Sequence, residues 1–136
     1  MKSIWNIIGM IQDASRVIVV GINPSNRHTR VRVYKNSTFS TLLRWMDHLG
    51  IKNFSFINCI DVRGEYKSNK IDYNLLEKSI NKKYKVLALG DFPSKALKKL
   101  NIDHFKLPHP SPRNRQLNDK AFESLILEEC RSYIYD

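Results

Sequence analysis

The stretch RVIVVGI, residues 16–22, is a run of apolar and mostly β-branched side chains. The run is continuous, without the alternation of polar and apolar residues that marks a strand with one solvated face. Similar runs follow at residues 54–60 (FSFINCI) and 85–90 (KVLALG), and a weaker one lies at 104–107 (HFKL). The pattern predicts four strands, with continuous runs that are covered on both faces.

Segments with the apolar spacing of helices lie between these runs. They are predicted at residues 40–49, from Asp72 onward, at 94–100 with Ser94 as the cap, and after an N-cap at Asn118 or Asp119. The apolar residues expected on their buried faces are Leu42, Leu43, Trp45, Met46, Leu49, Leu75, Leu76, Ile80, Tyr84, Phe122, Leu125, Ile126 and Cys130.

The order of elements is one N-terminal helix followed by four strand–helix units. Such alternation predicts an α/β fold, a three-layer sandwich with a four-stranded parallel sheet between helices and right-handed crossovers. The length of 136 residues suits a single domain spanning residues 1–136.

The chain is strongly basic, with a net charge of +10 and a sequence pI of about 9.8. This charge favours a polyanion such as nucleic acid as the partner, over a basic surface that binds nothing. The N-terminal sequence is too polar for a membrane span and poor as a signal peptide, so a cytoplasmic protein is expected.

The two cysteines, Cys59 and Cys130, are far apart in the sequence and neither belongs to a C-x-x-C pair. They therefore predict neither a zinc cluster nor an iron–sulfur site, and no metal or other cofactor is expected. Both are expected to be buried apolar residues in a reducing compartment.

Polar residues follow each predicted strand, at residues 21–27, 58–61, 90–91 and 108–114. Ligands of parallel sheets bind at the carboxyl ends of the strands, so Asn23, Asn58 and His109 are expected to converge there. Each also has a structural interpretation. Asn23 can open a turn, Asn58 can be hydrogen-bonded inside the core, and His109 lies between two prolines that suit a rigid turn.

Two further sets of residues have alternative interpretations. Asp61 and Asp91 together are a candidate magnesium site, although a lone carboxylate at a strand exit is typically a cap or turn residue. His28, His48 and His104 are expected at the surface or at an edge of the sheet.

The motifs GINPS at 21–25 and HPSPRN at 109–114 resemble the two active-site motifs of the uracil-DNA glycosylase superfamily. The second motif, with Gln116 after one further residue, resembles the single-strand-selective monofunctional branch (family 3). The first also resembles the mismatch-specific uracil/thymine branch. The similarity runs from about Arg16 to Asn118, and it implies a four-stranded parallel sheet between helices.

The resemblance implies a DNA glycosylase that flips a base out of DNA and hydrolyses the N-glycosidic bond of uracil or a related modified pyrimidine. Such an enzyme acts in base excision repair or modified-base removal. Neither motif contains a lysine, so a monofunctional enzyme without a lyase step is expected. Ser25 departs from the closest branches, which usually have glycine there. DNA, single- or double-stranded, is the expected partner of a monomer.

The resemblance also assigns roles to the strand-end residues. Asn23 corresponds to the asparagine that positions the attacking water. His109 corresponds to the histidine of the second motif and is suited to donate to the oxygen of the leaving base. Asn58 resembles the asparagine that reads the pyrimidine edge, and Gly21 and Ile22 are expected to line the same pocket.

The resemblance implies a stacking aromatic after the first motif, where we prefer Tyr34 to Phe39. Arg113, Asn114 and Arg115 are the candidate wedge that fills the gap left by a flipped base. The residues expected to contact DNA are Ser25, Arg27, Ser111, Pro112, Arg113, Asn114 and Arg115, with Arg30, Arg32 and Lys35 as further basic residues beside the pocket.

Two other functions remain open from the sequence. One is a non-catalytic DNA-binding protein with the glycosylase fold, since an amide activates water less well than a carboxylate. The other is a nucleoside- or nucleotide-processing α/β enzyme that acts on a free small molecule.

Overall fold

The fold was analysed in a computed structural model that describes residues 16–22, 37–60 and 67–136. Within these residues, four parallel strands form one sheet in the order β2-β1-β3-β4. The strands are β1 (Val17–Gly21), β2 (Ser55–Asn58), β3 (Lys85–Leu89) and β4 (Phe105–Leu107). All four predicted strands are confirmed.

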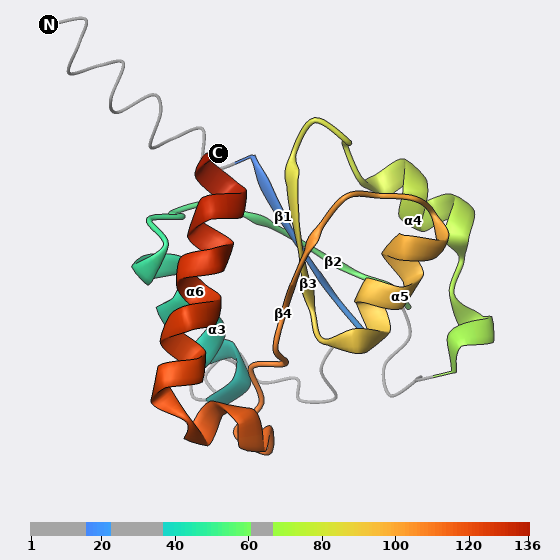
Figure 1. The fold of residues 1–136 in the computed structure, drawn as a ribbon. Helices are drawn as coiled ribbons and strands as arrows, with labels where there is room; N and C mark the ends of the chain where they lie inside the picture. The colour runs from blue at the N-terminus through green and yellow to red at the C-terminus, as the bar shows by residue number, and fades with distance from the viewer. Residues whose placement is uncertain (1–15, 23–36, 61–66) are drawn as a thin grey trace, which may run out of the picture.

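Helices cover both faces of this sheet. They are α3 (Ser37–His48), α4 (Tyr73–Ser79), α5 (Asp91–Lys99) and α6 (Lys120–Tyr135), with short 3-10 turns η1 (Ser68–Lys70) and η2 (Arg115–Asn118). Figure 1 shows α3 and α6 on one face and α4 and α5 on the other. The predicted three-layer α/β fold is therefore confirmed, while the expected N-terminal helix lies outside the described residues.

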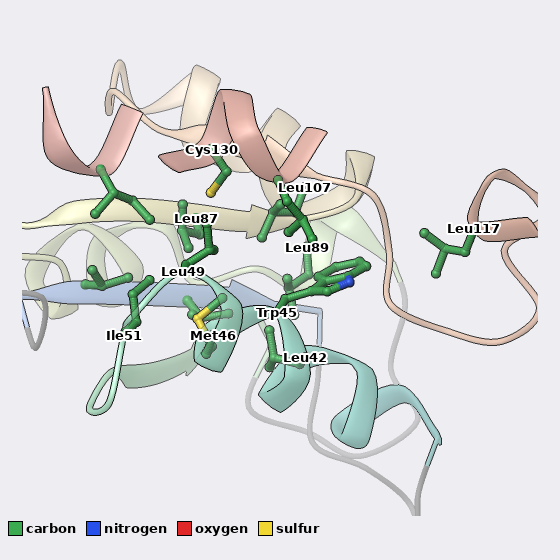
Figure 2. Packing of buried hydrophobic residues seen from close by; sticks show 14 residues of the cluster. Leu42, Trp45, Met46, Leu49, Ile51, Leu87, Leu89, Leu107, Leu117 and Cys130 are labelled. Atoms are coloured by element: carbon green, nitrogen blue, oxygen red, sulfur yellow. The ribbon is translucent and has the colours of Figure 1, made fainter. Parts of the chain in front are cut away.

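The core consists of two clusters because side chains alternate between the faces of a strand. Val17 and Val19 of β1 face α3 and α6, whereas Ile18 and Val20 face α4 and α5. Figure 2 shows the first cluster, in which Trp45 and the other labelled side chains of α3 pack against the sheet. Because β1 is buried on both faces, none of its positions favours a polar side chain. This explains why the apolar run at residues 16–22 is uninterrupted.

The edge of the sheet departs from the prediction that the continuous runs are covered on both faces. β2 is an edge strand, and its residues Ser55 and Phe56 are exposed. Leu43, Leu75 and Leu125, which were expected on buried helix faces, are exposed as well. Helical spacing alone does not show how far the covering sheet extends.

Asp119 is the N-cap of α6, which decides between the two predicted caps, Asn118 and Asp119. Its Oδ1 accepts hydrogen bonds from the backbone N–H groups of Ala121 and Phe122 at 3.0 and 3.1 Å. Asp72 caps α4 in the same way, through the N–H of Leu75 at 3.0 Å. Both carboxylates satisfy donors that the first turn of a helix leaves unpaired.

The prediction that Ser94 caps a helix is wrong. α5 begins three residues earlier at Asp91, because Gly90 with φ of +93° turns the chain directly after β3. Ser94 lies inside α5 and is buried, and its Oγ is 2.8 Å from Nε2 of His104. His104 is half-buried directly before β4, which is an edge strand, and His48 is exposed, so both agree with the expected place at the surface or at an edge of the sheet.

Cys59 and Cys130 are both buried and free, as predicted. Burial raises the pKa of Cys59 to about 11 and that of Cys130 to about 12, so both thiols stay protonated at neutral pH. In the part of the chain that the structure describes, no helix has the length and apolar character needed to cross a membrane.

Candidate active site

The carboxyl ends of the four strands lie along one edge of the sheet. Gly21 of β1 is level with Asn58 of β2, and the N–H of Cys59 donates to the carbonyl of Gly21 at 2.9 Å. On the other side, the N–H of Gly90 donates to the carbonyl of Leu107 at 2.8 Å. With neighbouring strands about 4.8 Å apart, the backbones of β2 and β4 are separated by roughly 14 Å. Side chains from the two outer strands can therefore reach one ligand between them.

Asn58, the last residue of β2, has a buried side-chain oxygen, Oδ1, that lacks a hydrogen-bond partner among the described residues. An unpaired buried acceptor costs about 1–3 kcal/mol, and such groups are rare in folded proteins. A ligand that brings an N–H donor to this oxygen would remove the penalty.

Gly21 is closely surrounded by side chains of β2. A Cβ at Gly21 would lie 2.9 Å from Cζ and 3.2 Å from Cε1 of Phe56, and 3.3 Å from Oδ1 of Asn58. The Phe56 ring and the Asn58 carbonyl oxygen thus approach the same point above the end of β1. A side chain at the first residue of the motif would therefore displace the Phe56 ring.

A hollow with a volume of about 440 Å³ opens beside the edge of β2. It is lined by residues 56–60 and by residues of η1, α4 and the segment between them, including Lys70 and Leu75. This volume is within the range of small-molecule sites. Phe56 and Asn58 are among the residues that line this hollow beside the edge strand.

His109 lies at the opposite end of the strand edge, two residues after β4. A Cβ added to Gly90 would lie 3.5 Å from the Cβ of His109. The histidine therefore passes directly over the end of β3. The N–H of Ser111 donates to Nδ1 of His109 at 3.2 Å. We assign the ring proton to Nε2 because Nδ1 accepts this hydrogen bond.

The protonation state of His109 follows from its surroundings. The ring is half-buried, and this burial lowers the pKa of His109 below its usual value. The imidazole is therefore neutral at pH 7. No acceptor for its Nε2–H lies among the described residues, so within them this donor is available at the carboxyl ends of the strands.

The loop after His109 is held by its own hydrogen bonds. The Nδ2 of Asn114 donates to the carbonyl of His109 at 2.9 Å, and its Oδ1 accepts from the N–H of Gln116 at 3.2 Å. The Oγ of Ser111 accepts from the N–H of Arg113 at 3.2 Å. Both ends of the Asn114 amide are thus engaged inside the loop.

Other residues of this loop are exposed to solvent. Pro112, Arg113 and Arg115 are exposed, whereas Ser111 is half-buried. The loop therefore presents two guanidinium groups on a turn that is held by its own hydrogen bonds.

Two other predicted site residues are only partly buried. Phe39, the third residue of α3, is half-buried, and Ile22 after β1 is half-buried too.

Several predicted site residues lie outside the described residues. They are Asn23, Ser25, Arg27, Tyr34, the basic residues Arg30, Arg32 and Lys35, and also His28 and Asp61. The structure therefore brings together Gly21, Asn58 and His109 at one edge. The roles assigned to the others stay predictions.

The magnesium alternative receives no support from Asp91. The Nζ of Lys106 donates to its Oδ1 at 2.8 Å, and this hydrogen bond, with the charge of Lys106, lowers the pKa of Asp91. Its carboxylate is exposed and already paired with a cation. Among residues 16–22, 37–60 and 67–136, no three His, Cys, Asp or Glu side chains are grouped closely enough to hold a metal ion.

Comparison with protein families decides the relationship of this chain. The family model described as the uracil DNA glycosylase superfamily matches residues 8–131, which include both motifs and the four strands that the structure describes. The chain belongs to the uracil DNA glycosylase superfamily. A search among curated proteins finds no match. Membership of this superfamily implies a glycosidase that acts on uracil or a related base in DNA.

In this member of the uracil DNA glycosylase superfamily, Phe56 also borders the candidate site, although the sequence did not point to it. It stands two positions before Asn58, so both side chains point to the same face of β2. That spacing is visible in the sequence. The neighbour on the other strand, Gly21, becomes visible only from the register of β1 with β2.

Proposed function

We propose that this protein is a monofunctional DNA glycosylase that hydrolyses the N-glycosidic bond of uracil or a related modified pyrimidine. The observation that carries the proposal is the Oδ1 of Asn58 at the end of β2, which is buried and has no hydrogen-bond partner in the part of the chain that the structure describes. Uracil presents an N–H group between two carbonyl groups, and an asparagine amide can accept from the first and donate to one of the others. The base edge therefore supplies the donor that Asn58 lacks.

His109 is the second group of the proposed mechanism. When the glycosidic bond breaks, its electron pair stays with the pyrimidine, and negative charge develops chiefly on a carbonyl oxygen of the base. The Nε2–H of neutral His109 is fixed by the bond between Ser111 and Nδ1, so it can donate to this oxygen without reorganising. Donors that are fixed in advance in a site protected from water stabilise such an anion strongly.

Water completes the hydrolysis. Its oxygen forms the new bond to the sugar carbon, one of its protons is released, and the base leaves as an anion that is then protonated. We assign the positioning of this water to Asn23, on the resemblance of GINPS to the first motif of the superfamily. The motif HPSPRN supports assignment to the family 3 branch, and GINPS also resembles the mismatch-specific branch.

DNA contacts are assigned to the exposed side of the site. A base inside a duplex must be flipped out, and the exposed Arg113 and Arg115 are suited to fill the gap and to bind phosphates. Ser111 and Pro112 belong to the same turn, and Asn114 holds that turn in place through His109. Ser25 and Arg27 join this surface, with Tyr34 rather than Phe39 as the stacking aromatic. One domain, acting as a monomer, is sufficient for this mechanism.

An excision assay tests the proposal. An oligonucleotide with one uracil is incubated with the protein and then treated with hot alkali, which cuts the strand wherever a base has been lost. We expect a cut at the uracil, in single strands, duplexes or both, and no cut in an oligonucleotide with thymine. Hydroxymethyluracil and other modified pyrimidines extend the panel.

Two results of this assay would contradict the proposal. No cut with any base, together with salt-sensitive binding of DNA, would favour a non-catalytic DNA-binding protein. No binding of DNA, together with turnover of free nucleosides, would favour a small-molecule enzyme.

A further inference from the structure

Phe56 is a large aromatic residue in a position that the core does not explain. Its side chain is 44% exposed, and it belongs to neither of the two core clusters. By contrast, the neighbouring Phe54 and Ile57 each pack against one of them. Phe56 therefore contributes little to the packing of the sheet.

The contacts of Phe56 are instead with the site. Two atoms of its ring and the Oδ1 of Asn58 all lie within 3.3 Å of the point where Gly21 would carry a Cβ. The ring and the carbonyl oxygen thus both lie over the end of β1, on the same face of the sheet. A phenyl ring edge offers this oxygen no N–H or O–H donor, but it takes up space in which water could stand.

We propose that Phe56 is a positioning residue of the base pocket, whose ring holds the Asn58 amide against Gly21 and keeps water away from its Oδ1. The inference rests on the proposed glycosylase function. In this arrangement, the carbonyl oxygen stays free for a base that carries an N–H at its edge. A base without that N–H leaves the oxygen unpaired and is bound more weakly.

Competition between two free bases measures this role directly. Uracil and 3-methyluracil differ at one ring nitrogen, which carries N–H in the first and a methyl group in the second. Each is used as an inhibitor of uracil excision from a single-stranded oligonucleotide. The ratio of the two inhibition constants reports how strongly the site selects the N–H group.

For Phe56→Ala, we expect uracil to bind about tenfold more weakly and 3-methyluracil to bind no more weakly, so the ratio falls about tenfold. Phe56→Leu keeps an apolar side chain and is expected to retain most of the ratio. Leu125→Ala removes a similarly exposed apolar side chain from α6 and is the matched control. A ratio in Phe56→Ala equal to that of the unmodified protein would overturn the proposal.

Gly21→Ala provides a second route that leaves Phe56 in the chain. Its new Cβ would meet Cζ of Phe56 at 2.9 Å, so the ring must move away. We expect the selection ratio to fall as in Phe56→Ala, and the double variant to have no lower ratio than Phe56→Ala alone. Losses that multiply in the double variant would show that the glycine and the ring act independently, against the proposal.

The same measurements separate this inference from the proposed function. A protein that excises uracil but selects N–H equally with and without Phe56 would retain the function and contradict the inference. A protein that excises no base would contradict both.

Discussion

At the end of β2, the carbonyl oxygen of Asn58 is buried and has no hydrogen-bond partner among the described residues, whereas at the end of β4 the polar groups of the loop are hydrogen-bonded to one another. Both regions carry an asparagine that is important to the site. Asn58 keeps an open acceptor, while Asn114 uses both ends of its amide to hold the loop. The two asparagines therefore have opposite relations to stability and function.

This difference shows how the site divides its work. The loop after β4 fixes the orientation of His109 before any ligand arrives, so its Nε2–H donor is already in place. The end of β2 instead retains an unsatisfied acceptor, which lowers stability until a ligand supplies a donor. Functional sites commonly carry such local costs.

His109→Ala is expected to have the largest effect on activity. Removing a fixed donor to a developing anion lowers kcat by about 100- to 1000-fold. Affinity for DNA should be retained because the exposed arginines are unchanged. Single-turnover excision and a DNA-binding titration measure the two quantities, with the exposed His48→Ala as the control. Full activity in His109→Ala would remove the histidine from the mechanism.

Asn58→Ala is expected to reduce excision of uracil by about 10- to 100-fold, as the loss of one or two hydrogen bonds to the base implies. Its free energy of unfolding should be unchanged or higher by up to about 1 kcal/mol, because the substitution removes an unpaired buried acceptor. Excision kinetics and urea denaturation test the two parts. A clear loss of stability would show that Asn58 is a satisfied structural residue.

Asn114→Ala should show the reverse pattern. The change leaves the carbonyl of His109 and the N–H of Gln116 without their partner, so the free energy of unfolding should fall by about 1–2 kcal/mol. Excision should fall by roughly tenfold as the loop loosens around His109. Denaturation of this variant beside Asn118→Ala, an exposed neighbour, supplies the comparison. If Asn114→Ala and Asn118→Ala are equally stable, the loop does not depend on the amide.

The pH dependence of stability gives the smallest effect. Because burial lowers the pKa of His109 below 6.5 in the folded state, the unfolded chain binds a proton at this residue more readily. Above pH 6.5 His109 therefore does not reduce the free energy of unfolding. As the pH falls from the unfolded pKa value through the folded one, the preference of the unfolded chain for the proton lowers the free energy of unfolding. Melting temperatures should fall less over this interval in His109→Gln than in the unmodified protein. Identical pH profiles would mean that His109 titrates as a solvated side chain.

The elements of the fold were predictable where local sequence determines them. The run VIVVG at 17–21 has no polar position, and Asp119 stands directly before an apolar periodic segment. Ser94 was misinterpreted because its partner, His104, comes from the segment that leads into β4. No local pattern shows that the two residues meet, or that Gly90 starts α5 early.

The site was predictable to a similar extent. All four strands are parallel, so Asn58 and His109 both lie at the carboxyl ends of the strands, as the alternation of strands and helices implies. The ring of Phe56 above Gly21 depends on the register of two strands, and the engagement of Asn114 depends on the path of a loop. Residue types alone do not show which polar groups satisfy one another.

A crystal structure of the protein with free uracil tests the central claim most directly. We expect the base to lie between β2 and β4, with its N–H about 2.9 Å from Oδ1 of Asn58 and one carbonyl oxygen about 2.9 Å from Nε2 of His109. Uracil bound elsewhere, or bound at the strand edge with Oδ1 of Asn58 still unpaired, would contradict the account.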